Sequence, residues 1–262
     1  MIDLHNHTYL CGHAYGQPSE YIECAIQRGI THFGFSDHAP LPDGLREGVT
    51  MRAGQEEEYL GMIIDEQKKY SGKIDILVGF EVDFPIRDTF NRSFFTDSRI
   101  DYLIGSCHYL EDWPVDHPEY IDGYNTRGID NVYENYYKTI SDLVKSNLFN
   151  IVGHFDLVKK FGHRSGRDFL SVIDDIAKLL HDNDTAVEIN TSGLRKPVKE
   201  FYPEKKIIKI LADRKVPITM GSDSHRPEEV GSDFEAASAL LKELGVNRIS
   251  YFKKRQRLEI NL

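Results

Sequence analysis

Short apolar segments alternate with amphipathic segments along most of this chain, and this alternation restricts its possible folds more than any other feature. The apolar segments have the length and composition of strands. They lie at 2–5, 32–37, 74–83, 102–109, 151–154, 186–191, 218–223 and 248–252. The amphipathic segments have helical spacing, and they lie at 18–28, 56–70, 131–146, 167–181, 203–213 and 227–244. This order predicts an α/β fold with a parallel sheet, either open or closed.

We expect one domain that spans residues 1–262. This length is common for a single α/β barrel, and the chain contains no internal repeat or low-complexity linker. The segment 110–130 is rich in proline, aspartate and glycine, which is typical of a long functional loop.

The composition indicates a cytoplasmic protein. Three sparse cysteines fit a reducing compartment better than a disulfide framework. The sequence shows no signal-peptide pattern at its start and no apolar run near the roughly 18 residues of a membrane span. The formal net charge of −10 disfavours binding to nucleic acid or to an anionic membrane, so we expect a small-molecule partner.

Potential metal ligands recur where the predicted strands end. Because the carboxyl ends of parallel barrel strands form one face, these side chains are expected to converge there. The set comprises seven histidines, one glutamate and one aspartate: His5, His7, His13, His38, Glu81, His108, His154, Asp223 and His225.

Each of these residues also has a structural interpretation. The pair His5 and His7 is a weak signal alone, and a histidine beside a glycine, such as His154, is more often a hydrogen-bonded core residue. Asp223 could cap the following helix. Glu81 differs, because a carboxylate within an apolar strand needs a compensating cation or strong donors. Recurrence at matching positions favours a shared site over separate structural roles.

This donor set favours particular metals and a particular reaction class. Imidazoles with a minority of carboxylates suit Zn²⁺, Fe²⁺ or Mn²⁺ better than Mg²⁺ or Ca²⁺. With three or four protein ligands for each ion, the set could hold two or three ions. Clustered divalent ions activate water and polarise phosphoryl oxygens, so metal-assisted phosphoester hydrolysis is the expected chemistry.

The sequence resembles the PHP (polymerase and histidinol phosphatase) superfamily, and within it the PHP-type histidinol-phosphate phosphatases. The motifs that carry this resemblance, in chain order, are "DLHNHT", "GFSDHAPLP", "GFEVDF", "IGSCHYLEDWPVD", "VGHFDLVKKFG", "EINTSGLRKP" and "GSDSH". They extend over nearly the whole chain. One departure is Cys11, which stands where a small polar residue is expected.

The resemblance implies a distorted (β/α)7, TIM-like barrel with a site for three divalent transition-metal ions at the carboxyl ends of the strands. The ions would be zinc, iron or manganese. The ligands implied for them are His5, His7, Glu81 and Asp223 for the first; Glu81, His108 and His154 for the second; and His13, His38 and His225 for the third.

The resemblance also implies a histidinol-phosphatase that hydrolyses L-histidinol phosphate in histidine biosynthesis. A metal-bridging hydroxide would attack phosphorus, with Glu81 and Asp223 positioning the metals and the hydroxide. The sequence assigns no general acid for the leaving alcohol.

Three residues are candidates for substrate binding. Arg195 follows the sixth predicted strand, and its guanidinium could bind phosphate oxygens in a bidentate manner. Lys159, or its neighbour Lys160, could have the same role. Asp156 could bind an ammonium or imidazole of the substrate. The alternatives are a solvated Arg195 and a helix-capping Asp156.

Two other functions remain open at this stage. A nuclease or nucleotidase of the same superfamily would contain a similar metal ring, but the acidic charge and the lack of interleaved aromatic and basic patches disfavour it. A non-catalytic metal-binding protein is the other alternative. Structural zinc sites are usually rich in cysteine, which this set is not.

Overall fold

The computed structural model describes residues 1–45 and 48–262. Seven strands form one sheet in the order β1-β2-β3-β4-β7-β8-β9, and every neighbouring pair is parallel. They are β1 (Ile2–Asp3), β2 (His32–His38), β3 (Asp75–Asp83), β4 (Tyr102–Ser106), β7 (Ile151–Val152), β8 (Ala186–Asn190) and β9 (Ile218–Gly221). The spatial order follows the chain order, so the carboxyl ends of all seven strands lie at the same end of the sheet.

The first and last strands of this sheet approach each other and nearly close it. The Leu4 amide donates to the Met220 carbonyl at 3.1 Å, and the His7 amide donates to the Ser224 carbonyl at 3.0 Å. Asn6 and Ser224 form an isolated parallel bridge beyond the strand ends. The fold is therefore a distorted TIM-like (β/α)7 barrel, as predicted.

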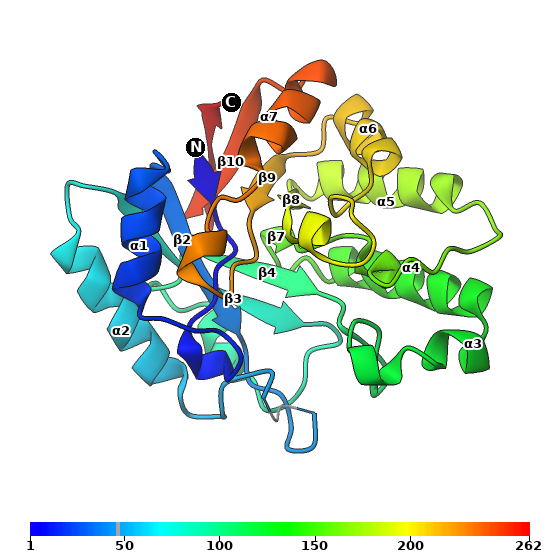
Figure 1. Ribbon diagram of the computed structural model, residues 1–262, viewed down its shortest axis with the longest axis horizontal. Coiled ribbons are helices and arrows are strands. Elements are labelled where there is room, and N and C mark those ends of the chain that lie inside the picture. Colours follow the sequence, from blue (N-terminus) through cyan, green and yellow to red (C-terminus); the bar gives the residue numbers. More distant parts are fainter. Residues whose placement is uncertain (46–47) are drawn as a thin grey trace.

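Helices surround the strands (Figure 1). They are α1 (Pro18–Gln27), α2 (Glu56–Lys69), α3 (Gly123–Arg127), α4 (Ile129–Ser146), α5 (Leu170–Asp182), α6 (Lys205–Asp213) and α7 (Phe234–Glu243). Helix α1 starts with Pro18 in its first turn and a reciprocal cap between Gln17 and Glu20, which satisfies amides that have no partner within the helix. Within the described ranges, none of the helices is both long enough and apolar enough to cross a bilayer.

The C-terminal region differs from expectation in two places. The expected helix 227–244 is divided into a 3-10 turn, η6 (Pro227–Glu229), and α7. Gly231 lies between them with φ 63°, and its amide donates to the Asp3 carboxylate at 3.0 Å, so the chain leaves the helical conformation there. The expected strand 248–252 forms as β10 (Arg248–Lys253), but it pairs antiparallel with β11 (Gln256–Asn261) outside the barrel.

The expected loop 110–130 is more ordered than its composition suggested. It follows a strand that ends at Ser106 rather than at 109, and it contains most of a short hairpin of β5 (Tyr109–Leu110) and β6 (Trp113–Pro114), a 3-10 turn and α3. The Trp113 ring lies 5.1 Å from the Tyr124 ring, and both side chains are buried. These two aromatic side chains, together with the buried Leu110 and Val115, anchor the segment to the core.

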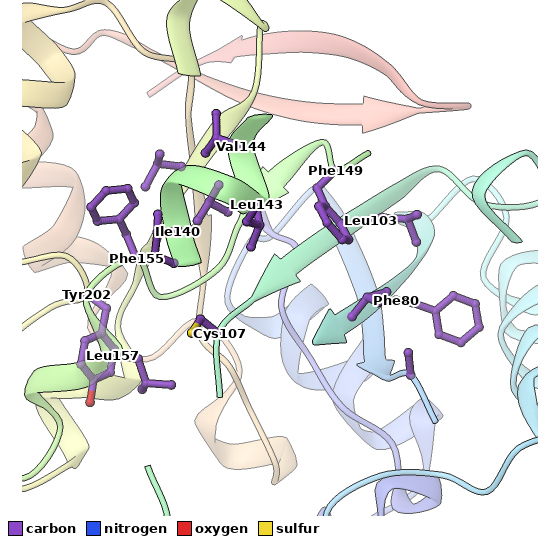
Figure 2. Packing of buried hydrophobic residues seen from close by; sticks show 14 of the residues in the cluster. Phe80, Leu103, Cys107, Ile140, Leu143, Val144, Phe149, Phe155, Leu157 and Tyr202 are labelled. Carbon is purple, nitrogen blue, oxygen red and sulfur yellow. The ribbon is translucent and has the colours of Figure 1, made fainter. Parts of the chain in front are cut away.

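Buried apolar side chains fix the helices against the barrel. Figure 2 shows Ile140, Leu143 and Val144 of α4 in one cluster with Leu103 of β4 and Phe149. Truncating a buried leucine of this kind costs about 2–5 kcal/mol. This packing holds the strand ends in fixed relative positions, as a multi-strand site requires.

Inside the barrel, one aromatic side chain connects several strands. Tyr102 on β4 is fully buried, and its hydroxyl donates to the carbonyls of Leu4 at 2.6 Å and Phe35 at 3.2 Å. A Cβ at Gly34 would lie 2.1 Å from this hydroxyl, and one at Gly79 would lie 2.6 Å from the ring. Glycine is therefore needed at both positions to accommodate Tyr102.

Candidate metal centre

The carboxyl ends of the barrel strands border a cavity of about 460 Å³. The predicted metal ligands gather at this end because their places relative to the strands are so regular. His5, His108, His154 and Asp223 each lie two residues beyond a strand, after β1, β4, β7 and β9 respectively. His38 ends β2 and lies opposite Glu81 in the register of β3. The structure thus brings together side chains that are far apart in the sequence.

Glu81 lies at the centre of this cluster and is 2% exposed. Its two carboxylate oxygens approach ring nitrogens of five histidines. The Oε2 distances are 3.0 Å to His38 Nδ1, 3.1 Å to His5 Nε2 and 3.7 Å to His7 Nε2. The Oε1 distances are 2.8 Å to His154 Nε2 and 3.5 Å to His108 Nε2. One carboxylate could therefore serve two neighbouring cations.

Asp223 and the remaining histidines form the outer part of the cluster. Asp223 Oδ1 lies 3.2 Å from His7 Nε2, and the Ser192 hydroxyl donates to Oδ2 at 3.1 Å. The His225 ring is stacked 4.1 Å from the His7 ring and 4.4 Å from the His13 ring. The nine predicted side chains thus form one continuous cluster.

Several buried polar atoms in the cluster lack a hydrogen-bond partner within the described residues. They include His5 Nε2, both ring nitrogens of His7, Glu81 Oε2 and His225 Nε2. His5 Nε2 lies close to Glu81 Oε2, yet their directions do not form a hydrogen bond. Leaving such atoms unpaired is costly. Nitrogen and oxygen lone pairs that face one another without a donor between them are suited to divalent metal ions. The residues present therefore fit a metal centre.

Burial and neighbouring charges move the pKa values of the cluster away from their usual values. Burial alone would raise the pKa of Glu81, but His5 and other imidazoles outweigh it and hold the pKa well below its usual value. Burial would lower the pKa of His5, but Glu188, Glu81 and Asp223 raise it well above normal. Burial, followed by the neighbouring His7, lowers the pKa of His225 well below its usual value. Metal binding requires ionised carboxylates and neutral imidazoles, so Glu81 and His225 already suit a cation, whereas His5 would release a proton when a metal ion binds.

Carboxylates behind the cluster bind the opposite ring nitrogens. Glu188 Oε1 lies 2.7 Å from His5 Nδ1, and Asp83 Oδ1 lies 3.0 Å from His108 Nδ1. Neither residue was predicted from the sequence. Asp83 could have been found, because it lies two residues after Glu81 on the same strand and therefore points to the same face.

The predicted substrate-binding residues lie beside the cavity rather than on its wall. Arg195 donates from Nη2 to the Ser222 carbonyl at 2.6 Å, and its Nε lies 3.7 Å from Glu229. Lys159 is 1% exposed, and its amine lies 2.9 Å from the carboxylate of Asp156. These positions do not support substrate contact by Lys159 or Asp156, because a buried ion pair occupies both side chains.

Three other cationic residues line the cavity: Lys160, Lys196 and Arg226. Lys160 lies 2.9 Å from Asp116, and the Arg226 guanidinium lies 5.0 Å from the Tyr15 ring. Burial lowers the pKa of Lys196. The prediction of a lysine after the fifth strand thus fits Lys160 rather than Lys159, because consecutive residues of the turn point in different directions.

Cys11 lies next to the outer histidines. Its side chain is buried, and its sulfur lies within 4.8 Å of ring nitrogens of His13 and His225. Burial, together with the negative charge of Asp37, raises the pKa of this thiol. The thiol is therefore held in its neutral form in the absence of a cation.

Comparison with known sequences gives consistent matches. The model of the family described as PHP domain matches residues 3–192. A protein named "Probable histidinol-phosphatase" from Deinococcus radiodurans is 36% identical over 254 residues, which cover 96% of each chain. The histidinol-phosphatase of Bacillus subtilis is 28% identical, and the match covers 89% of this chain and 97% of that protein.

The fold also matches a solved structure. The crystal structure of histidinol phosphate phosphatase from Lactococcus lactis, complexed with zinc, L-histidinol and phosphate, superposes with a TM-score of 0.82. The superposition covers 98% of each chain at 22% sequence identity. At this identity the likeness establishes a shared barrel architecture.

Proposed function

The chain belongs to the PHP domain family, and from this premise we propose that it is a metal-dependent phosphomonoesterase that hydrolyses L-histidinol phosphate to L-histidinol and phosphate in histidine biosynthesis. The cluster of converging imidazoles and carboxylates around Glu81 is the observation that carries this proposal. The relative that is 36% identical along almost the whole chain supports the substrate.

The proposed metal centre uses nine side chains and holds three divalent ions, with zinc as the first candidate. The ligands are His5, His7, His13, His38, Glu81, His108, His154, Asp223 and His225. Bound ions of this kind supply Lewis acidity and a hydrolytic nucleophile near neutral pH. Glu81 lies among five histidines from four segments of the chain, and the Ser192 hydroxyl donates to Asp223, so both carboxylates would be held in place beside the ions.

Cationic side chains on the cavity wall would bind the phosphoryl group. Lys160, Lys196 and Arg226 bring positive charge to the cavity of a chain with a formal net charge of −10. Arg195 would act indirectly, because its guanidinium holds the Ser222 carbonyl beside Asp223. We therefore assign to Lys196 the phosphate contact that the sequence suggested for Arg195.

Acidic residues on the same wall suit the alcohol portion of the substrate. Asp83, Asp116 and Glu229 line the cavity. L-Histidinol carries an ammonium and an imidazole, and both can donate to carboxylates. A wall that combines lysines with carboxylates thus complements a molecule that carries both a phosphate and a cation.

The proposal extends to the whole chain. We assign residues 1–262 to one catalytic domain, because the barrel uses ligands from near both ends of the sequence, His5 and His225. The three cysteines are unpaired, which is consistent with a reducing cytoplasm.

A phosphate-release assay with matched substrates tests this function. Zinc-loaded protein should cleave L-histidinol phosphate with a kcat/KM at least about a hundredfold above that for nucleoside monophosphates, a difference of about 2.7 kcal/mol in transition-state binding. Single-stranded DNA is included in the same series, and metal content is measured on the same sample. Equal or faster cleavage of nucleotides or DNA would overturn the proposed substrate in favour of a nuclease or nucleotidase.

A further inference from the structure

Glu188 is a buried carboxylate for which the proposed reaction has no role. It lies on β8 and is 1% exposed. Among the described residues, its hydrogen bonds go to a histidine ring, a backbone amide and a side-chain amide, rather than to a lysine or arginine. Burying a carboxylate lowers the stability of the fold unless hydrogen-bond donors satisfy it. The groups that contact Glu188 indicate its role.

One oxygen of Glu188 faces a proposed ligand. Oε1 lies 2.7 Å from His5 Nδ1, and an ionised carboxylate can only accept there, so Nδ1 must hold the proton. When His5 binds a metal ion, the other ring nitrogen, Nε2, would be the unprotonated one. It points into the cluster, 3.1 Å from Glu81 Oε2 and 3.9 Å from Asp223 Oδ1. Glu188 thus selects the tautomer of His5 that can bind a metal.

The other oxygen of Glu188 connects two further ligands. Oε2 accepts the backbone amide of His154 at 2.9 Å and the side-chain amide of Asn190 at 3.0 Å. The same Asn190 nitrogen lies 3.2 Å from Asp223 Oδ2. His154 has φ 20°, an uncommon backbone conformation that this hydrogen bond helps to hold. One carboxylate therefore connects ligands that follow β1, β7 and β9.

The backbone leaves space for this carboxylate. A Cβ placed at Gly221 would lie 1.9 Å from Glu188 Oε1 and 2.6 Å from His5 Cβ. Any side chain at position 221 would displace either the carboxylate or the histidine. Glycine at the end of β9 is thus required by the Glu188–His5 contact.

We propose that Glu188 is a positioning residue that sets the tautomer of His5 and aligns His5, His154 and Asp223 around the inner ions, which are the two proposed metal ions that would share Glu81. This inference rests on the proposed metal centre. Within the described part of the chain, Glu188 makes no hydrogen bond to His13, His38 or His225. The effect of Glu188 should therefore be confined to the inner ions.

The substitution Glu188→Gln separates this role from simple space filling. If the new amide nitrogen faces His154 and Asn190, donors oppose donors. If it faces His5, it must donate to Nδ1, and the ring proton moves to Nε2, where the metal should bind. Neither orientation satisfies all three partners, although the volume is almost unchanged.

The test is a zinc titration with a chromogenic competitor, performed on wild type, Glu188→Gln and the control Glu200→Gln. Glu200 pairs with Lys159 and Arg164, away from the cluster. We expect Glu188→Gln to weaken the inner sites about 10- to 100-fold, while the remaining site and the control stay within about threefold of wild type. Zinc affinities equal to wild type at every site would overturn the inference.

A second measurement needs no variant. Long-range ¹H–¹⁵N NMR spectra of the zinc-loaded wild type should show His5 protonated at Nδ1 and metal-bound through Nε2, and the opposite tautomer would overturn the inference even if Glu188→Gln fails to fold. A wild type that binds no zinc would instead overturn the proposed function. The two failures are therefore distinguishable.

Discussion

Two ion pairs at the amino end of the barrel differ from the central carboxylate at its carboxyl end. At the amino ends of the strands, Asp75 lies 3.0 Å from Lys253, and Asp184 lies 2.8 Å from Arg257. At the carboxyl ends, Glu81 is buried among imidazoles, and one of its oxygens has no hydrogen-bond donor within the described residues. These two pairs are partly exposed and mutually satisfied, whereas Glu81 is buried and incompletely satisfied.

This difference indicates what each end contributes. Exposed pairs such as those of the β10–β11 hairpin usually add little to stability. Buried groups without partners reduce stability unless something else satisfies them. The carboxyl end therefore has a functional arrangement that the amino end does not share, and variants at the two ends should behave differently.

Metal removal, which affects only the carboxyl end, should have the largest effect of the changes considered. Dialysis against a chelator should lower the rate of histidinol phosphate hydrolysis about a thousandfold or more, equivalent to about 4 kcal/mol in the barrier. It should also lower the melting temperature, because ions that bind the folded state stabilise it. Added zinc should restore both quantities. Full activity in protein shown to be metal-free would refute the metal-dependent reaction.

Glu81→Gln should have the next largest effect. The neutral amide removes a charge that five histidines surround, so we expect the loss of at least one ion per chain and a fall in kcat/KM of about a hundredfold or more. Metal analysis and steady-state kinetics on the same preparation measure this. Glu259→Gln in the hairpin is the matched control and should leave both quantities unchanged. Retention of all ions by Glu81→Gln would contradict the central position of this residue.

The proposed ligand positions were predictable because they follow from strand direction. In a parallel sheet, residues just beyond each strand meet at one end, so a recurring pattern of His5, His108, His154 and Asp223 could be interpreted without coordinates. The seven parallel strands were predictable from alternation for the same reason. Periodicity did not reveal that the last expected strand, β10, pairs antiparallel outside the barrel.

Other features depend on side-chain direction, which spacing does not determine. Lys159 and Lys160 are adjacent in a short turn, yet Lys159 binds Asp156 inside the fold and Lys160 lines the cavity. Glu188 resembles an ordinary strand residue until its distance to His5 is known. Arg195 has the chemistry of a phosphate ligand; its Nη2 donates to a backbone carbonyl, whereas its Nη1 has no hydrogen-bond partner within the described residues. Sequence identifies the kind of residue, and packing decides which neighbour it contacts.

Lys196→Met tests this distinction with a smaller effect. Loss of the amine should lower kcat/KM for histidinol phosphate at least about tenfold, or about 1.4 kcal/mol, because a phosphate contact is lost. Metal content should not change. The exposed Lys199, replaced in the same way, controls for net charge and should retain wild-type kinetics. A Lys196→Met enzyme as fast as wild type would mean that Lys160 and Arg226 suffice for phosphate binding.

The smallest effect is expected at the amino end, where Arg257→Met removes the pairs with Asp184 and Glu259. Arg257 is 25% exposed, Asp184 60% and Glu259 31%, so water already screens much of these attractions. The free energy of unfolding, measured by urea denaturation, should fall by no more than about 1 kcal/mol. The difference from wild type should shrink further in 1 M salt, where the screening length is about 3 Å. Metal content and kcat/KM should remain at wild-type values, since Arg257 lies at the opposite end of the barrel from the proposed centre. If Arg257→Met instead lowered metal affinity, the two ends would be energetically coupled, and their charges could no longer be assigned to separate roles.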